Sequence, residues 1–220
     1  MTARPPGPFG FPIMVEVRDV PVFVAGGGRE AAGKVKALAG LGAKVRLWVA
    51  DQALASEPGD RTALPAHSGP FDPALLDGAR LAIIDTGDRA LDRRIAGEAR
   101  RHQVLVNVVD DPESCDWSAP AILRRGDLTI AIATAGVAPA LASRLRDQLR
   151  DVVGPEYRDL VDIFAEMRPR IMASGRSLAD RRRLWYSLVD GQALDHLRAG
   201  RGREARDAIS GAIESWETAR

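Results

Sequence analysis

A glycine-rich turn between a short apolar run and an amphipathic stretch constrains the fold more than any other feature of this sequence. The run VPVFVA at residues 20–25 is rich in β-branched side chains, and AAGKVKALAGLG at residues 31–42 has apolar residues at helical spacing. The intervening GGGREA at residues 26–31 fits the pattern G-x-G-x-x-G/A. Glycines permit this tight turn and let backbone N–H groups approach a pyrophosphate, which then lies at the positive end of the following helix. The sequence therefore predicts a dinucleotide-binding turn.

An acidic residue at the end of the second strand supports the same interpretation. Such a residue is expected about 20 positions after the first glycine, where it binds the ribose hydroxyls. Asp51 stands 25 positions after Gly26 and directly follows the apolar run KVRLWVA. A carboxylate there favours NAD, since it would repel the 2′-phosphate of NADP. The alternatives are a plain glycine turn with Asp51 in a loop, and a P-loop, which fails because Lys34 lies outside the required spacing.

The alternation of strand and helix continues through the first half of the chain. Apolar runs at residues 44–50, 80–85 and 103–109 predict further strands, and residues 90–102 predict a helix before the last of them. Short strand–helix–strand connections predict right-handed βαβ units and a parallel sheet. Residues 52–78 are rich in Pro, Gly and Asp and give only a weak strand signal.

The second half of the chain has a different character. The stretch APAILRRGDLTIAIATAG predicts two strands around an Arg-Gly-Asp turn, which is a hairpin outside the parallel sheet. From Pro139 onward leucines recur at spacings of three and four, which predicts helices. These changes place domain boundaries near residues 112 and 150. The predicted parts are therefore 1–112, 113–150 and 151–220.

Composition narrows the classes of function. The chain has 31 basic and 30 acidic residues, and this balance gives no global field for binding nucleic acid. A single cysteine excludes an internal disulfide framework and suits a reducing compartment. No apolar run reaches the roughly 18 residues of a membrane span, and the first residues lack the layout of a signal peptide. We expect a soluble cytoplasmic protein. No metal site is predicted, because the three histidines are far apart and Cys115 is alone.

The order of these segments resembles that of the precorrin-2 dehydrogenases, the siroheme synthase family. The resemblance rests on the segments FPIMVEVRDVPVFVAGGGREAAGKVKALAGLGAKVRLWVAD, LAIIDTGDRALDRRIA and VNVVDDPESCDWSAPAILRRGDLTIAIATAGVAPALASRLRDQL. It implies the stand-alone or amino-terminal module, without the methyltransferase half. The implied α/β architecture is a Rossmann-type NAD-binding domain, an α+β region through which two subunits interlock, and a helical carboxy-terminal domain. The implied activity is oxidation of precorrin-2 to sirohydrochlorin with NAD⁺. Some members also insert Fe²⁺, a lyase activity, and the sequence leaves open whether this chain does so with Fe²⁺ or Co²⁺.

The resemblance also assigns cofactor contacts. By position they fall on Gly26, Gly28, Arg29, Glu30, Ala50, Asp51 and Thr86. In the strand end Ile84-Asp85-Thr86-Gly87-Asp88, Thr86 keeps a polar position near the cofactor, while Asp85 replaces a small residue of the family. An aspartate there could crowd or repel the dinucleotide. This departure concerns how the cofactor is seated, and the expected class of cofactor stays NAD.

The aspartate that closes NVVD, Asp110, matches the family's catalytic residue. Dehydrogenation delivers a hydride to the nicotinamide and removes a proton, so a carboxylate near the ring is a suitable base. From the residues alone, capping of a helix or turn before Asp111-Pro112 is the more common role for Asp110, and the resemblance favours the catalytic one. We assign Asp111 mainly to that turn, because a residue that precedes proline is forced toward an extended conformation.

A polycarboxylate tetrapyrrole needs arginines and polar groups in its pocket. Arg124, Arg144 and Thr134 are the candidates for binding it, since arginine pairs with a carboxylate through two parallel hydrogen bonds. Taken singly, each arginine is more typical of a solvated helix or turn. In the stretch that includes Thr134, Ala135 replaces a glycine of the family and Ala138 replaces a serine.

Three other kinds of protein are considered as alternatives, and two of them remain. A short-chain dehydrogenase is disfavoured, because neither tyrosine is followed four residues later by lysine. A non-catalytic regulatory module that binds NAD or a tetrapyrrole would share the glycine turn. A degenerate member of the family, which binds without turnover, would be consistent with Asp85, Ala135 and Ala138.

Overall fold

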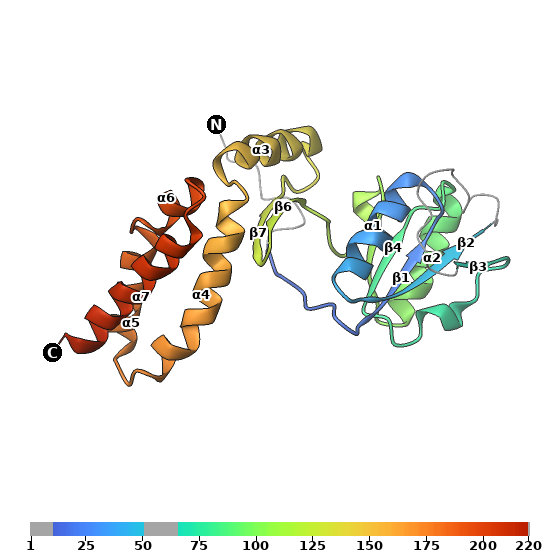
Figure 1. The fold of residues 1–220 in the computed structure, drawn as a ribbon. Coiled ribbons are helices and arrows are strands. Elements are labelled where there is room, and N and C mark those ends of the chain that lie inside the picture. The colour runs from blue at the N-terminus through green and yellow to red at the C-terminus, as the bar shows by residue number, and fades with distance from the viewer. Residues whose placement is uncertain (1–10, 51–65, 220) are drawn as a thin grey trace, which may run out of the picture. The chain divides into compact units, whose positions relative to one another are not determined.

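Short apolar runs pair into a parallel sheet in the first part of the chain. The computed structural model describes residues 11–50 and 66–219 (Figure 1). The strands of this sheet are β1 (Pro21–Ala25), β2 (Lys44–Val49), β3 (Ala66–Ser68), β4 (Leu81–Ile84) and β5 (Leu105–Val108). Their order across the sheet is β3-β2-β1-β4-β5, and all pairings are parallel. The predicted parallel sheet is thus confirmed.

Two helices connect these strands. Helix α1 (Arg29–Gly40) joins β1 to β2, and α2 (Arg89–Arg101) joins β4 to β5. Helix α2 begins where Asp88 accepts hydrogen bonds from the N–H groups of Ala90 at 2.8 Å and Leu91 at 3.2 Å, as an N-cap aspartate does. Along the chain, strands β1, β2 and β3 extend the sheet in one direction, and β4 and β5 then extend it from β1 in the opposite direction. The carboxyl ends of β1 and β4 therefore mark the point at which α/β sheets of this kind bind ligands.

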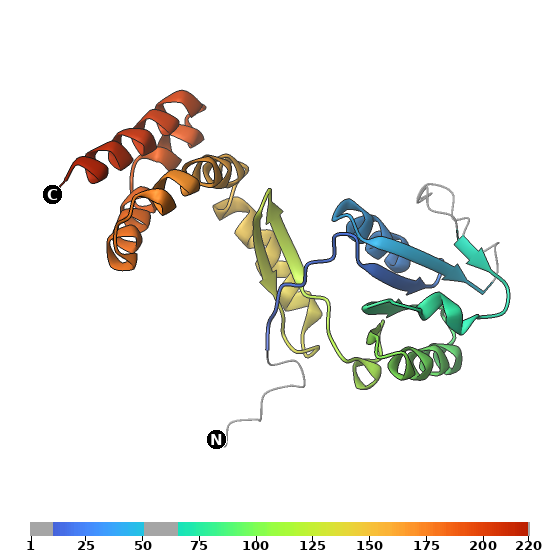
Figure 2. The same cartoon turned by 90° about the horizontal axis from the view of Figure 1, so that it is seen from below.

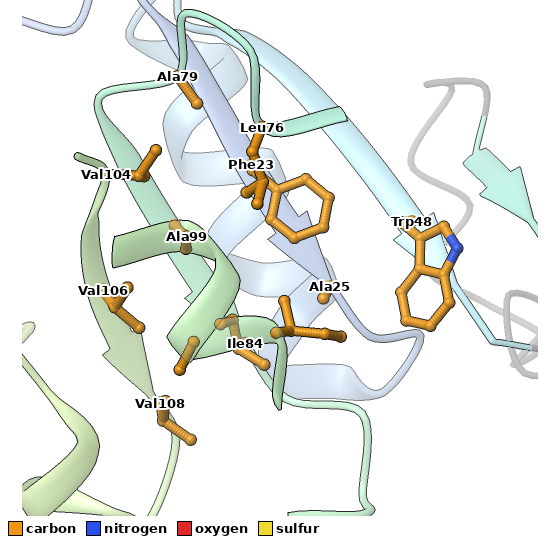
Figure 3. Packing of buried hydrophobic residues seen from close by; sticks show 13 residues of the cluster. Phe23, Ala25, Trp48, Leu76, Ala79, Ile84, Ala99, Val104, Val106 and Val108 are labelled. Carbon is orange, nitrogen blue, oxygen red and sulfur yellow. The ribbon is translucent and has the colours of Figure 1, made fainter. Parts of the chain in front are cut away.

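Each face of the sheet is covered by one helix. Val24, Leu47 and Ile83 pack against Ala31 and Val35 of α1. On the other face the larger cluster contains strand residues such as Phe23 and Val106, α2 residues such as Ile95, and Leu76 of the short 3₁₀ turn η2 (Pro73–Leu76) (Figure 3). Figure 2 shows α1 and α2 on opposite sides of the strands. Because both faces are buried, the central strands β1 and β4 are uniformly apolar rather than alternating.

The weakest sequence prediction concerned residues 52–78. There the structure has the edge strand β3 and the turn η2, and residues 51–65 lie outside the described part. The three-residue β3 carries His67 and Ser68, both exposed, so it has too few apolar residues to give a strand signal. Phe71 of the same region packs edge-on against Trp48, with ring centroids 5.6 Å apart.

The second part of the chain has a hairpin followed by helices. Strands β6 (Ala121–Arg125) and β7 (Leu128–Ile132) are antiparallel, as predicted, and α3 (Pro139–Val152) packs on them. Four further helices follow, α4 (Glu156–Ala173), α5 (Leu178–Val189), α6 (Ala193–Arg198) and α7 (Gly202–Thr218). Their common core contains Leu160, Ile171, Leu184 and Ile209. The predicted helical spacing therefore reflects real packing in α4 to α7.

The contacts divide the chain into two compact units. The first contains the described residues up to Ala119 together with Ala135–Val137, and the second contains Pro120–Thr134 and the residues from Ala138 onward. Among the described residues no helix is both long and apolar enough to cross a membrane. The predicted division at residues 112 and 150 stays a prediction.

Candidate functional site

The glycine turn lies directly against the end of β4. Gly26 is buried, has a φ of 129°, and donates its N–H to the carbonyl oxygen of Trp48 at 2.9 Å. A Cβ at this position would stand 1.9 Å from the carbonyl oxygen of Asp85. Both the backbone conformation and the contact exclude every residue except glycine. The turn therefore holds the beginning of α1 close against the neighbouring strand end.

The amino end of α1 fits the pyrophosphate of a dinucleotide. Gly28 is the N-cap, with a φ of −77°, and no side chain caps the helix. No atom lies within 4 Å of where a Cβ at Gly28 would stand. The first helical N–H groups thus have no side-chain cap beside an open Cβ position, which suits an anionic group at the positive helix end. Arg29 and Glu30, the next predicted contacts, are exposed at the start of α1.

Thr86 is held by an aspartate that sequence reasoning missed. Asp92, in the first turn of α2, is buried and accepts hydrogen bonds from the Thr86 N–H at 3.0 Å and from its hydroxyl at 2.6 Å. The hydroxyl therefore donates to Asp92, while its lone pairs face the Asp88 N–H at 3.2 Å. An acidic residue in the first turn of a predicted helix was the available signal, but it is also typical of ordinary helix starts.

Asp85 lies at the same edge of the sheet. Its N–H donates to the carbonyl oxygen of Ala25 at 2.8 Å, which extends the pairing of β1 and β4. Burial raises the pKa of the Asp85 carboxyl above its ordinary value, and nearby carboxylates raise it further. These carboxylates belong to Asp92, Glu30 and Asp110. The first turns of α1 and α2 and the end of β5 thus all bring negative charge toward Asp85.

Asp110, the predicted catalytic residue, has a strained backbone. It follows β5 with a φ of 57°, in the left-handed region that non-glycine residues rarely occupy. Its side chain is exposed at the carboxyl edge of the sheet, where it contributes to the charge around Asp85. A residue held in this conformation is a candidate for function, because such strain persists only where surrounding contacts offset its free-energy cost, and it is concentrated at functional sites.

Asp111 has a different environment from Asp110. It is buried, accepts a hydrogen bond from Arg93 Nε at 2.9 Å and another from the Ser114 hydroxyl at 2.9 Å. These two bonds, with Arg93 the stronger influence, hold the pKa of the Asp111 carboxyl below its ordinary value. It also precedes the 3₁₀ turn η3 (Pro112–Ser114). The structural role predicted for Asp111 agrees with these contacts.

Cys115 belongs to the same loop and also has a structural environment. Its Sγ accepts from the N–H of Val108 at 3.1 Å and donates to the Val108 carbonyl oxygen at 3.1 Å. Burial raises the pKa of the Cys115 thiol, so the thiol stays protonated. Among residues 11–50 and 66–219 no group of three or more His, Cys, Asp or Glu is arranged to hold a metal ion.

The remaining predicted contacts fall in three places. Ala50 is exposed directly after β2, and Asp51 lies outside the described residues. Arg124 on β6 and Arg144 on α3 are exposed within the second unit. Thr134 belongs to that unit too, and its hydroxyl accepts from the Ala138 N–H at 3.1 Å. The structure therefore brings the glycine turn, Thr86 and Asp110 together at the carboxyl ends of the parallel strands. It gives Thr134 a local role at the start of α3.

Three family models match the chain in succession. A model with the description NAD(P)-binding matches residues 13–121, the sirohaem biosynthesis protein central model matches residues 125–151, and the sirohaem synthase dimerisation region matches residues 156–213. The chain belongs to the siroheme synthase family. The order of the three matches follows the sheet, the hairpin with α3, and the helices α4 to α7.

Individual family members agree with this assignment. Siroheme synthase of Methylococcus capsulatus is 32% identical over 93% of this chain and 43% of its own length. Siroheme synthase of Chromobacterium violaceum is 34% identical over 89% of this chain and 42% of its own length. The present chain thus spans less than half the length of these relatives. A solved structure of SirC, a precorrin-2 dehydrogenase, covers 92% of this chain with a TM-score of 0.68 at 20% identity, which shows a shared fold.

Proposed function

We propose that the chain is a precorrin-2 dehydrogenase, which oxidises precorrin-2 to sirohydrochlorin with NAD⁺. The observation that carries the proposal is Asp110, a strained and exposed carboxylate at the carboxyl edge of a sheet whose glycine turn fits a dinucleotide. The family and the fold shared with SirC support the same reaction. When bound, NAD⁺ supplies the acceptor for the hydride that leaves the macrocycle.

In this proposal, residues of the chain bind the cofactor, accept the proton and contact the substrate. The N–H groups at the start of α1 bind the pyrophosphate, and Gly28 leaves room for it. Asp92 orients Thr86, so that its hydroxyl has a fixed direction beside the cofactor. Loss of a hydride and loss of a proton together remove two hydrogens from precorrin-2, and Asp110 accepts the proton. Arg124, Arg144 and Thr134 remain the candidates for contacts to the substrate's carboxylates.

The test is a spectroscopic assay of two variants. Purified protein supplied with precorrin-2 and NAD⁺ should develop the absorbance of sirohydrochlorin. Asp110→Asn should lower the rate at least about 100-fold, the usual effect of removing a general base. Asparagine is the clean substitution, because it tolerates the φ of 57° better than other side chains. Glu113→Gln removes the same charge from an exposed position nearby and should retain the wild-type rate.

Other outcomes distinguish the alternatives. If the protein binds NAD⁺ but precorrin-2 remains unchanged, the chain is a non-catalytic NAD- or tetrapyrrole-binding regulatory module. If Asp110→Asn retains the full rate, another group accepts the proton. Adding Fe²⁺ or Co²⁺ to preformed sirohydrochlorin without dinucleotide tests metal insertion separately, because chelation removes two pyrrole protons and transfers no hydride.

The proposal also includes a homodimer located in the cytoplasm. The family model described as a dimerisation region matches residues 156–213, whereas the sequence-based prediction placed the subunit contact at residues 113–150. Exposed apolar side chains occur in both segments, for example Leu141 and Leu178. The contact can therefore be located by substitution in each segment.

A further inference from the structure

Asp85 stands where the two halves of the proposed cofactor crevice meet. The strand order reverses at β1 and β4, and Asp85 directly follows β4. Its carbonyl oxygen closes against Gly26, and its N–H bonds to Ala25. The N–H and the carbonyl group of Asp85 are therefore both held against the end of β1, at Ala25 and Gly26.

The position of Asp85 defines which half of a dinucleotide it would face. The glycine turn after β1 fits the pyrophosphate, and the acidic residue that binds the adenosine ribose is expected at the end of β2. A dinucleotide that lies across the crevice must then extend its nicotinamide half over the ends of β4 and β5. Asp85 and Asp110 follow these two strands.

The charges that act on Asp85 from the surrounding elements are all negative. Glu30 acts from α1, Asp92 from α2, and Asp110 from the end of β5. Asp92 is occupied by its two hydrogen bonds to Thr86. Among the described groups that shift the pKa of Asp85 there is no cation, so a cationic part of a ligand is the charge that would stabilise its carboxylate.

The two redox forms of the cofactor differ in charge on that half. Oxidised nicotinamide carries a positive charge and reduced nicotinamide carries none, while the pyrophosphate is the same in both. A carboxylate near the ring therefore attracts the oxidised form only. We propose that Asp85 is a specificity-determining residue that makes the crevice bind NAD⁺ in preference to NADH. The inference rests on the proposed function, because it takes the crevice to be the NAD site.

The preference has a consequence for turnover. Hydride transfer removes the positive charge from the nicotinamide, so the attraction to Asp85 is lost in the product complex. NADH is then bound more weakly than NAD⁺ in the same crevice. The carboxylate that replaces a small residue thereby limits competition of NADH with NAD⁺ for the crevice, although it also repels the pyrophosphate.

The test compares dissociation constants of NAD⁺ and NADH by isothermal titration calorimetry. The ratio Kd(NADH)/Kd(NAD⁺) should fall about fivefold in Asp85→Asn, the effect of one partly exposed charge. Asp19→Asn is the matched control, because it removes one carboxylate from the opposite end of β1, where Asp19 pairs with Lys44 at 3.4 Å. Its ratio should equal that of the wild type.

Two measurements on the unmodified protein make the test independent of the variant's folding. Raising the ionic strength should lower the wild-type ratio, because salt screens the attraction. Lowering the pH should do the same as Asp85 becomes protonated, because burial and the neighbouring carboxylates raise the pKa of its carboxyl above the ordinary value.

Each result bears on the proposal separately from the dehydrogenase activity. An unchanged ratio in Asp85→Asn, or an equal change in Asp19→Asn, overturns the role of Asp85. Failure of the wild type to bind either dinucleotide overturns both the inference and the proposed function. Binding with the expected ratio but without oxidation of precorrin-2 overturns the proposed function alone.

Discussion

At the scale of single residues, two adjacent aspartates differ in exposure and in backbone conformation. Asp110 is exposed with a φ of 57°, whereas Asp111 is buried and bonded to Arg93 and Ser114. The sequence alone gave both the same description, a strand end before proline. The resemblance separated them by position, and the contacts of Asp111 agree with that separation. Their physical difference could not be predicted, because it depends on an arginine 18 residues away on α2.

The Arg93–Asp111–Ser114 contact predicts a pH-dependent stability. The pKa of Asp111 is lowered in the folded protein, so its contribution is present above the ordinary value near pH 4 and is lost as pH falls through the folded value. Asp111→Asn should therefore lower the melting temperature by a few degrees at pH 7. The deficit should shrink as the pH is lowered below about 4.

Thermal melting monitored by circular dichroism from pH 3 to pH 7 checks this expectation. Asp116→Asn is a useful comparison, because Arg100 binds Asp116 at 3.0 Å from the same helix. A deficit for Asp111→Asn that stays constant across the pH range would contradict the assigned cause.

At the scale of elements, the glycine turn depends on two glycines for different reasons. Gly26→Ala should lower the free energy of unfolding by at least about 2 kcal/mol, because the methyl group meets the Asp85 carbonyl at 1.9 Å and φ is 129°. Gly28→Ala should cost less than about 1 kcal/mol, since nothing lies within 4 Å. Its methyl group should nevertheless weaken NAD⁺ binding at least about tenfold, because it fills the space left for the pyrophosphate.

Urea unfolding and calorimetric titration of the same samples separate the two effects. Gly33→Ala is the control, because it lies inside α1 with open space around it. It should leave NAD⁺ binding unchanged and raise stability by up to about 1 kcal/mol. If Gly28→Ala binds NAD⁺ with the full wild-type affinity, the pyrophosphate does not bind at this turn.

The elements were predictable where a single periodicity dominated. Strands such as β1 and β5 and the helix α2 follow directly from apolar runs and helical spacing. The edge strand β3 was not predictable, because it has three residues and its pairing depends on β2. The bond between Asp92 and Thr86 was missed for a related reason, since it joins a strand end to the next helix. Local pattern contains no information about such contacts.

At the scale of the whole molecule, the proposed homodimer requires a surface at which two copies of the chain meet. A groove of about 520 Å³ in the helical segment is lined by residues of α4 and α5, among them the exposed Met172, Leu178 and Tyr186 together with arginine side chains. In the other segment Leu141 and Leu145 of α3 are exposed. Spacing predicted the helices correctly, but it could not distinguish side chains buried within one chain from those left at its surface.

Substitution in each segment tests the proposed homodimer. We expect the wild type to be a dimer by light scattering and Leu178→Asp to shift it toward monomer, because a charge is costly inside an apolar contact. Leu141→Asp is the paired variant for residues 113–150. If only Leu141→Asp dissociates the dimer, the contact lies in the segment predicted from the sequence. A monomeric wild type would refute the homodimer.

The strained conformation of Asp110 has a consequence for the dynamics of its loop. A left-handed aspartate costs about 1 kcal/mol or more, and the fixed residues that follow it must supply that energy. If the contact between Arg93 and Asp111 opens, Asp110 is free to relax to an extended conformation and to turn its carboxylate away from the sheet edge. With Asp110 as the proposed base, local opening of this loop would inactivate the protein while the sheet stays folded. Amide hydrogen exchange at Asp111 and Ser114, whose N–H groups bond to Val108 and Asp111, would then report catalytic readiness more directly than global stability does.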